Sequence, residues 1–143
     1  SIAVAIFSMD NLKEDLLPCL NNTGNIYIDD KRNITMTYLE VQCRKLVKEH
    51  NVKVVLVDYL QQMSQYLSMK KVGNRLKALA EELQITIIVL SQLTKHIESR
   101  EDKTPRLEDI KHQNLIEQAN IVIFLYQNSQ NNIEMLVAKN DLK

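Results

Sequence analysis

Lys53–Asp58 reads KVVLVD, a continuous run of apolar, mostly β-branched residues that stops at an aspartate. Such a run is typical of a strand buried on both faces of a parallel sheet, because a strand with one wet face alternates apolar and polar residues instead. An aspartate directly after the run lies where the chain leaves the sheet. The segment therefore predicts a parallel α/β fold with an acidic group at the rim of its sheet.

Strand-like and helix-like patterns alternate on both sides of this segment. The predicted strands are Ile2–Phe7, Asn25–Ile28, Lys53–Val57 and Ile85–Leu90, the last one also buried. The predicted helices are Asn11–Leu20, Met36–Asn51, with Thr35 as its N-cap, and Val72–Leu83. Strands that alternate with helices indicate right-handed crossovers and a parallel sheet.

The C-terminal part of the sequence changes character. A polar and charged stretch runs from Ser91 to about Asn114. Two further strands, Ile121–Tyr126 and Ile133–Ala138, are separated only by the polar turn Gln127–Asn132. Because the connection is too short for a crossover, we expect an antiparallel hairpin at one edge of the sheet.

Composition excludes several classes of protein. The 143 residues carry no formal net charge and are 45% hydrophobic, which is ordinary for a globular domain and lacks the basic surplus of a non-specific nucleic-acid binder. No apolar run approaches the ~18–20 residues that span a bilayer, and the run after Ser1 lacks the basic region of a signal peptide. Cys19 and Cys43 have no metal-binding spacing, so buried thiols in a reducing cytoplasm are expected.

Glycine is scarce in this sequence. Only Gly24 and Gly73 occur, where an average usage of ~7% predicts about ten. A phosphate-cradling loop needs several glycines close together, so that backbone N–H groups can face the phosphates. Neither G-x-x-x-x-G-K-[ST] nor G-x-G-x-x-G is present, and the sequence therefore contains no loop of this kind.

Polar side chains follow three of the predicted strands. Ser8 and Asp10 follow the first, Asp58 follows the third, and Gln92 follows the fourth. Ligands of open parallel sheets bind at the carboxyl ends of the strands, so these groups predict a site for a divalent cation and a polarised water.

Each residue also has a simpler interpretation. A strand often ends in an aspartate such as Asp58 because the chain turns there. Asp10 suits the first turn of a helix, where the helix dipole favours a negative charge. Gln92 is equally compatible with a solvated loop amide. Taken alone, each pattern is weak, although four apolar residues and an aspartate form the Walker-B pattern of ATPases.

Taken together and in order, the segments resemble the motor domain of DnaB-type replicative DNA helicases. VVLVDYLQQM (Val54–Met63) resembles the family's I-I-[VI]-I-D-Y-L-Q-L-M, and ITIIVLSQLTK (Ile85–Lys95) resembles P-[VI]-[IV]-A-L-S-Q-L-[NS]-R. FSMD (Phe7–Asp10) stands where the family has F-S-L-E-M. Further matching strings are NIYIDD (Asn25–Asp30), RLKALAEEL (Arg75–Leu83), IVIFLY (Ile121–Tyr126) and VAK (Val137–Lys139).

The resemblance implies a fold and a set of partners. The fold would be a RecA-like three-layer sandwich, with a mainly parallel sheet and a C-terminal antiparallel edge hairpin. Residues 1–143 would form a single partial motor domain without its P-loop unit. Intact members of the family are cytoplasmic homohexamers that use ATP and Mg²⁺ to translocate on single-stranded DNA. A helicase loader and primase are further partners that the resemblance implies.

Roles carry over residue by residue. Asp58 would hold Mg²⁺ through water, and Ser8 would lie beside the nucleotide. Asp10 occupies the place of the glutamate that polarises the attacking water, and it is one methylene shorter. Gln92 would sense the γ-phosphate and relay its presence toward the DNA. Lys139 matches a lysine that reaches into the neighbouring subunit's ATP site.

Two departures from the family pattern separate two hypotheses. Asp141 stands where the family has its trans-acting arginine, and a carboxylate there would repel a γ-phosphate. The family's DNA-binding string R-E-S-G is replaced here by Lys111, His112, Gln113 and Asn114. The lysine can contact a phosphate as a single charge, but it lacks the paired donors of an arginine guanidinium. The chain is therefore either a fragment of an active helicase motor or a degenerate, non-catalytic paralogue that binds DNA or a helicase.

Overall fold

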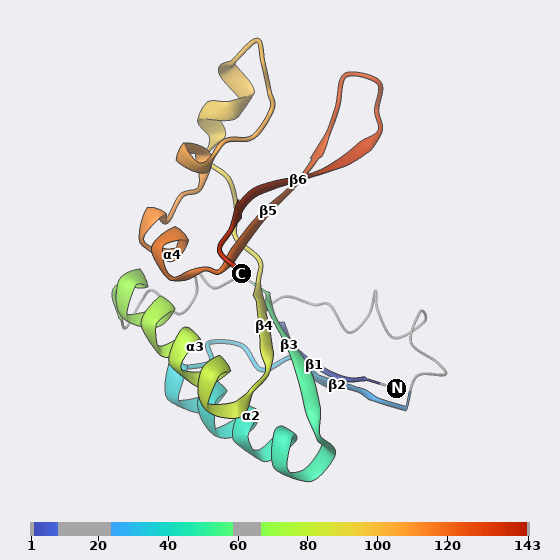
Figure 1. Cartoon of the computed structure of the whole chain (residues 1–143), viewed down its shortest axis with the longest axis vertical. Helices are drawn as coiled ribbons and strands as arrows, with labels where there is room; N and C mark the ends of the chain where they lie inside the picture. The colour runs from blue at the N-terminus through green and yellow to red at the C-terminus, as the bar shows by residue number, and fades with distance from the viewer. Residues whose placement is uncertain (1, 9–23, 59–66, 143) are drawn as a thin grey trace. The chain divides into compact units, whose positions relative to one another are not determined.

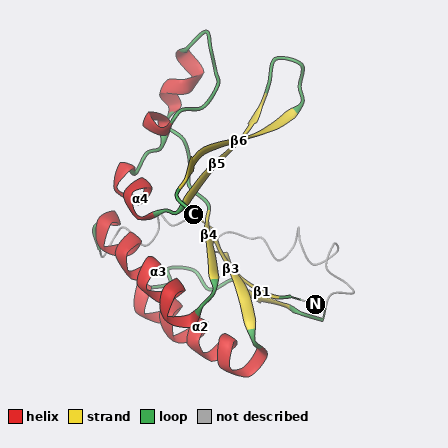
Figure 2. Cartoon of the chain, in the orientation of Figure 1, coloured by secondary structure: helices red, strands yellow, loops and turns green. Residues whose placement is uncertain are grey.

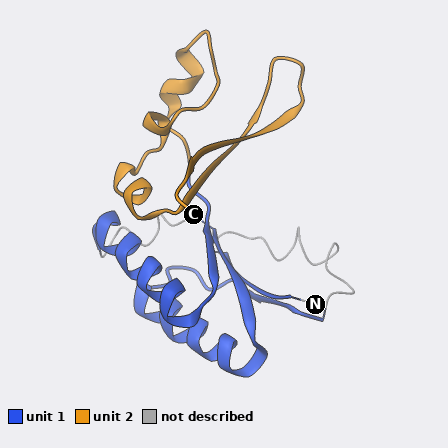
Figure 3. Cartoon of the chain, in the orientation of Figure 1, with its two compact units in different colours: residues 1–91 blue, residues 92–143 orange. Residues whose placement is uncertain are grey.

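The computed structural model describes residues 2–8, 24–58 and 67–142. The helix predicted at Asn11–Leu20 lies outside these residues. The described chain divides into two compact units, residues 1–91 and 92–143 (Figure 3).

The first unit contains a four-stranded parallel sheet. Its strands are β1 (Ala3–Ser8), β2 (Ile26–Asp29), β3 (Val52–Asp58) and β4 (Thr86–Val89), in the spatial order β2-β1-β3-β4. All three neighbouring pairs are parallel. The parallel sheet predicted from KVVLVD is therefore confirmed, and β3 is one of its two inner strands.

Within the described residues, two helices connect strands of this sheet. They are α2 (Met36–His50), between β2 and β3, and α3 (Met69–Leu83), between β3 and β4. Both connections cross the sheet in the same direction, so right-handed crossovers place both helices on one face. Figure 2 shows α2 and α3 lying together on that side.

Local signals set the ends of these helices. The hydroxyl of Thr35 accepts a hydrogen bond from the backbone N–H of Tyr38, so the predicted N-cap of α2 is confirmed. Ser68 caps α3 in the same way, and α3 therefore begins three residues before the predicted Val72. Asn51 and Gln84 end the two helices in the left-handed conformation, with φ of 52° at each.

The core of this unit lies between the sheet and the helices. Its fully buried members come from β1, β3, α2 and α3, and include Phe7, Leu39, Val55 and Leu79. Cys43 is also fully buried, and burial raises the pKa of its thiol to about 12. The helices are further joined by two bidentate ion pairs, Arg44 with Glu82 and Arg75 with Glu40, with N–O distances of 2.7 and 2.8 Å.

Burial of β4 is less complete than the sequence predicted. Ile88 and Leu90 are each 44% exposed, whereas Val55 of β3 is fully buried. The reason is the face of the sheet: Ile88 lies opposite Leu56 of β3, which is itself only half-buried, whereas Val55 belongs to the other face. The described part of β3 is therefore fully buried on one face only, and not on both faces as predicted. An apolar run alone does not distinguish an edge strand from an inner one.

The second unit is built around the antiparallel hairpin of β5 (Ile121–Gln127) and β6 (Ile133–Asn140), which confirms the predicted pairing. These strands form a two-stranded sheet of their own. In the turn between them, the side chain of Asn128 accepts hydrogen bonds from the N–H groups of Gln130 and Asn132. One face of the hairpin is apolar and strongly exposed, and its members are Ile123, Leu125, Ile133, Met135 and Val137.

The polar stretch before the hairpin is more ordered than the sequence indicated. It contains two short 3-10 helices, η3 (Lys95–Ser99) and η4 (Leu107–Asp109), followed by the α-helix α4 (Gln113–Gln118). These elements are drawn in yellow and orange in Figure 1.

Candidate functional site

The carboxyl ends of β1 and β3 lie side by side. In the parallel register, Phe7 is opposite Val57 and Ser8 is opposite Asp58, and Val57 is in turn opposite Val89 of β4. Ser8 and Asp58 are the last residues of β1 and β3, and both are buried, at 1% and 7% exposed. The predicted rim therefore contains a hydroxyl and a carboxylate on adjacent strands.

Asp10 and Gln92 are the other two predicted members of the rim. Asp10 lies in the segment 9–23, outside the described residues. The chain leaves β4 at Leu90, whose N–H donates to the carbonyl of Val57 at 3.0 Å. Gln92 follows two residues later, is exposed, and is the first residue of the second unit.

The rim fits one part of a magnesium–nucleotide site. Mg²⁺ keeps several waters and uses one or two carboxylates together with substrate phosphates. Asp58 supplies one such carboxylate, and Ser8 adds a neighbouring hydroxyl. Among residues 2–8, 24–58 and 67–142, no group of three His, Cys, Asp or Glu side chains is arranged to hold an ion alone.

The predicted DNA-binding residues lie at the start of α4. Lys111 is exposed, His112 is the residue before the helix and is half-buried, and Asn114 lies in the first turn. The side-chain amide of Gln113 donates to the carbonyls of Leu107, at 2.9 Å, and Ile110, at 2.8 Å. Within the described residues, Nε2 of His112 is buried without a hydrogen-bond partner.

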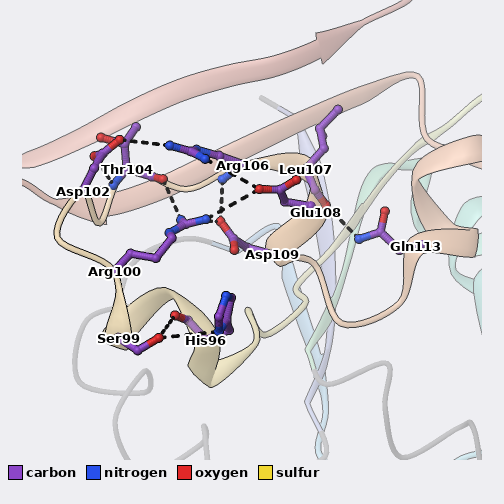
Figure 4. Close-up of polar contacts among 10 residues, drawn as sticks. All are labelled: His96, Ser99, Arg100, Asp102, Thr104, Arg106, Leu107, Glu108, Asp109 and Gln113. Carbon is purple, nitrogen blue, oxygen red and sulfur yellow. Dashed lines mark hydrogen bonds and ion pairs between the residues drawn. The ribbon is translucent and has the colours of Figure 1, made fainter.

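A buried ion pair lies directly before this segment (Figure 4). Oδ2 of Asp109 accepts hydrogen bonds from Nη2 of Arg100 at 2.7 Å and from the backbone N–H of Arg106 at 2.8 Å. Burial opposes the charge on Asp109, but these two donors outweigh it and hold the pKa of the carboxyl below its usual value. Glu108 is the exposed neighbour of this pair, 3.8 Å from Arg100.

Lys139 is held within its own unit. Its ammonium donates to the carbonyls of Ile116 and Ala119, both at 2.8 Å, and lies 3.0 Å from the carboxylate of Asp141. An ammonium has three N–H donors, and this arrangement accounts for three partners. The two carbonyls belong to the C-terminal end of α4, where a positive charge is favoured by the helix dipole.

Sequence reasoning missed the Arg100–Asp109 pair and α4. One local signal was available for the pair, because the spacing of Arg106 and Asp109 is that of a helix cap, and the N–H of Thr104 bonds Asp102 in a turn before it. α4 is short and mostly polar, so it has little apolar periodicity to detect. None of the helices in the described ranges has the length and apolar character needed to cross a membrane.

Comparison with known proteins gives consistent matches over almost the whole chain. The family model for the DnaB-like helicase C terminal domain matches residues 3–141. The chain is 36% identical to the replicative DNA helicase DnaC of Bacillus subtilis (strain 168), over 84% of this chain and 30% of that protein. The same identity and coverage are found with the replicative DNA helicase DnaB of Geobacillus stearothermophilus. The chain thus spans less than a third of the length of these relatives.

Solved structures share the fold. One, titled as an ATPase domain, superposes with a TM-score of 0.81 at 22% identity, covering 98% of this chain and 67% of that one. A second, titled as a DnaB-like replicative helicase and its interactions with primase, gives a TM-score of 0.80 at 23% identity, covering 98% of this chain and 46% of that one. The predicted RecA-like α/β fold is therefore confirmed.

Proposed function

This chain belongs to the DnaB-like helicase C-terminal domain family, and on that premise we propose that it is a segment of the motor of an ATP-dependent replicative DNA helicase. In the complete protein, this motor would work as a cytoplasmic homohexamer that hydrolyses ATP with Mg²⁺ and moves along single-stranded DNA to unwind the duplex. Residues 1–143 would be one partial domain of it. Primase is a proposed partner, because a related helicase structure is titled for its interactions with primase, and a helicase loader is another.

The observation that carries this proposal is the alignment of Ser8 with Asp58 at the carboxyl ends of adjacent parallel strands. That edge is where ligands bind in open α/β sheets. We propose that Asp58 holds Mg²⁺ through water and that Ser8 contacts the nucleotide. Asp10, two residues beyond Ser8, is proposed as the group that polarises the attacking water. Bound Mg²⁺ would neutralise charge developing on the phosphates.

The phosphates themselves need a cradle of backbone N–H groups, which this sequence does not contain. We therefore expect these 143 residues alone to turn over no ATP, with or without single-stranded DNA. Robust hydrolysis by the isolated chain would contradict this expectation.

The proposed DNA contact is the segment Lys111–Asn114. Lys111 is exposed and would contact a phosphate as a point charge. His112 and Asn114 would contact the same DNA strand. Gln92 would sense the γ-phosphate of the bound nucleotide and relay its presence toward this segment. DNA binding through so few charges is expected to be weak and sensitive to salt.

A second candidate function is a non-catalytic paralogue that binds DNA or a helicase ring. The contacts of Lys139 favour it, because this proposed trans-acting group already has three partners in its own unit. One of them is Asp141, the carboxylate at the arginine position. Under this reading, the subunit would contribute no cation to a neighbouring nucleotide.

A chimaera separates the two functions. Residues 3–141 would replace the matching segment of the Bacillus subtilis helicase, which is 36% identical. If the segment is catalytic, the ring should show DNA-stimulated ATP hydrolysis, and Asp58→Asn should lower it by about tenfold or more. Glu49→Gln, which removes an exposed carboxylate on α2, is the matched control. A chimaera that assembles and binds DNA but hydrolyses no ATP would refute the first function and support the second.

A further inference from the structure

The segment that follows β4 pairs with the segment that precedes α4. Leu93 and Ile110 form an antiparallel bridge, and the N–H of Thr94 donates to the carbonyl of Asp109 at 2.8 Å. In an antiparallel register, the residue before Leu93 and the residue after Ile110 lie on the same side of the bridge. Those residues are Gln92 and Lys111, so the bridge brings the proposed γ-phosphate sensor next to the proposed DNA contact.

The carboxylate of Asp109 stabilises the loop between these two paired segments. Oδ2 of Asp109, which is 2% exposed, binds both the guanidinium of Arg100 and the backbone N–H of Arg106. The same Nη2 of Arg100 also donates to the carbonyl of Thr104 at 3.0 Å. Figure 4 shows these groups converging on Asp109 from successive parts of the loop. The backbone of Asp109 contacts Thr94, while its side chain closes the loop from Arg100 to Arg106.

Removal of the carboxylate would leave Arg100 with only the longer contact to the exposed Glu108, at 3.8 Å. Removal of the guanidinium would leave the buried carboxylate of Asp109 with a backbone donor and no close cation, and both changes are unfavourable. Replacement of both by apolar groups removes that penalty, but it also removes the acceptor for the N–H of Arg106 and the donor to Thr104. The pair can therefore be separated experimentally into its effect on stability and its effect on geometry. Glu108 provides the contrast, because its side chain is 71% exposed and lies at 3.7 to 3.8 Å from the arginines.

We propose that Arg100 and Asp109 are a positioning pair, which fixes the Leu93–Ile110 bridge and so sets the position of Lys111 relative to Gln92. The inference rests on the proposed function for its meaning, since those two residues are the proposed DNA contact and phosphate sensor. The pair touches neither ligand. The pair makes the Leu93–Ile110 bridge rigid, so that a displacement at Gln92 moves the segment that begins at Lys111.

The test uses the 143-residue chain and three variants: Asp109→Asn, Glu108→Gln as the matched change of charge, and the double variant Arg100→Met with Asp109→Leu. Amide hydrogen exchange measures the bridge directly, at Thr94 and across Lys111–Leu115. Fluorescence anisotropy with a labelled oligothymidylate measures DNA affinity. Thermal unfolding measures stability in parallel.

Asp109→Asn should accelerate exchange at Thr94 by about tenfold or more, the scale of one lost charge-assisted hydrogen bond. It should also weaken oligothymidylate binding by about tenfold, whereas Glu108→Gln should change both by less than about twofold. The double variant should recover the melting temperature, because no unpaired charge remains. Its exchange at Thr94 should stay fast and its DNA binding weak, which a purely stabilising role for the pair would not produce.

Two results would overturn the positioning role. One is exchange at Thr94 in Asp109→Asn, or in the folded double variant, that matches the unaltered chain. The other is an equal loss of DNA affinity in Glu108→Gln, which would assign the effect to net charge. If the unaltered chain binds no oligothymidylate, or if Lys111→Ala binds it equally well, the proposed DNA contact is wrong. Exchange at Thr94 then decides the positioning role by itself.

Discussion

Replacement of Lys139 by methionine should loosen α4. Methionine keeps most of the apolar stem and removes the ammonium, which donates to the carbonyls of Ile116 and Ala119 and pairs with Asp141. A hydrogen bond to a charged group contributes about 1.5–3 kcal/mol. The ion pair adds less than about 1 kcal/mol, because Asp141 is 56% exposed.

The net loss should be smaller than the sum of these contributions, because the two carbonyls can bind water once the ammonium is replaced by methionine. We therefore expect a loss of about 2 kcal/mol in the free energy of local opening, or exchange that is about thirtyfold faster. The amide of Ala119, which bonds the carbonyl of Leu115, reports this opening directly. Amide hydrogen exchange followed by NMR or mass spectrometry is the assay.

Two controls make this prediction specific. Asp141→Asn keeps both carbonyl contacts and should cost less than about 1 kcal/mol. Lys103→Met removes a positive charge from an exposed position in the same unit and should leave exchange at Ala119 unchanged. If Lys139→Met accelerates that exchange no more than Lys103→Met does, Lys139 does not anchor α4. An effect on ATP hydrolysis in an assembled ring without any effect on exchange would instead support its action in trans.

Three further predictions concern the core, the buried thiol and the stability of the protein at acidic pH. Leu79→Ala, at a site that is 2% exposed, should lower the free energy of unfolding by about 2–5 kcal/mol in denaturant titrations, whereas Val41→Ala at a 53% exposed site should change it by less than about 0.5 kcal/mol. Cys43, with its pKa raised to about 12, should resist alkylation at pH 8 in a Cys19→Ser variant and react only on unfolding, so rapid labelling of the native protein would refute its burial. The pKa of the Asp109 carboxyl is lower in the folded than in the unfolded chain, so its contribution to stability is full above about pH 4 and is lost as the pH falls through the folded pKa. The free energy of unfolding, measured at a series of acidic pH values, should therefore depend less on pH in Asp109→Asn. Identical pH profiles for the two proteins would contradict the ion pair.

The sheet could be predicted from sequence because its determinants are local. KVVLVD predicts an inner parallel strand, and Thr35 marks the start of α2 by a hydrogen bond to a residue three positions away. The meeting of Ser8 and Asp58 followed from a topological rule, since parallel strands present their carboxyl ends at one edge. The exposure of Ile88 was not predictable in this way, because it depends on which face of the sheet is covered, and an apolar run is the same on both faces.

The environment of Lys139 could not be predicted either. Its partners are backbone carbonyls 23 and 20 residues earlier in the chain, and a carbonyl has no signature in the sequence. The Arg100–Asp109 pair spans nine residues without any regular periodicity. Resemblance assigned a role to Lys139, but only the folded chain shows what its side chain already contacts.

The apolar face of the β5–β6 hairpin affects how this protein behaves at the bench. Three cross-strand pairs, Ile123 with Val137, Leu125 with Met135 and Gln127 with Ile133, form a ladder whose apolar members are 49 to 79% exposed. A ladder of this kind attracts fluorescent hydrophobic dyes while the protein is still folded, and it promotes self-association as concentration or sulfate rises. Purification at low protein concentration, in chloride and not sulfate buffers, follows directly from that surface.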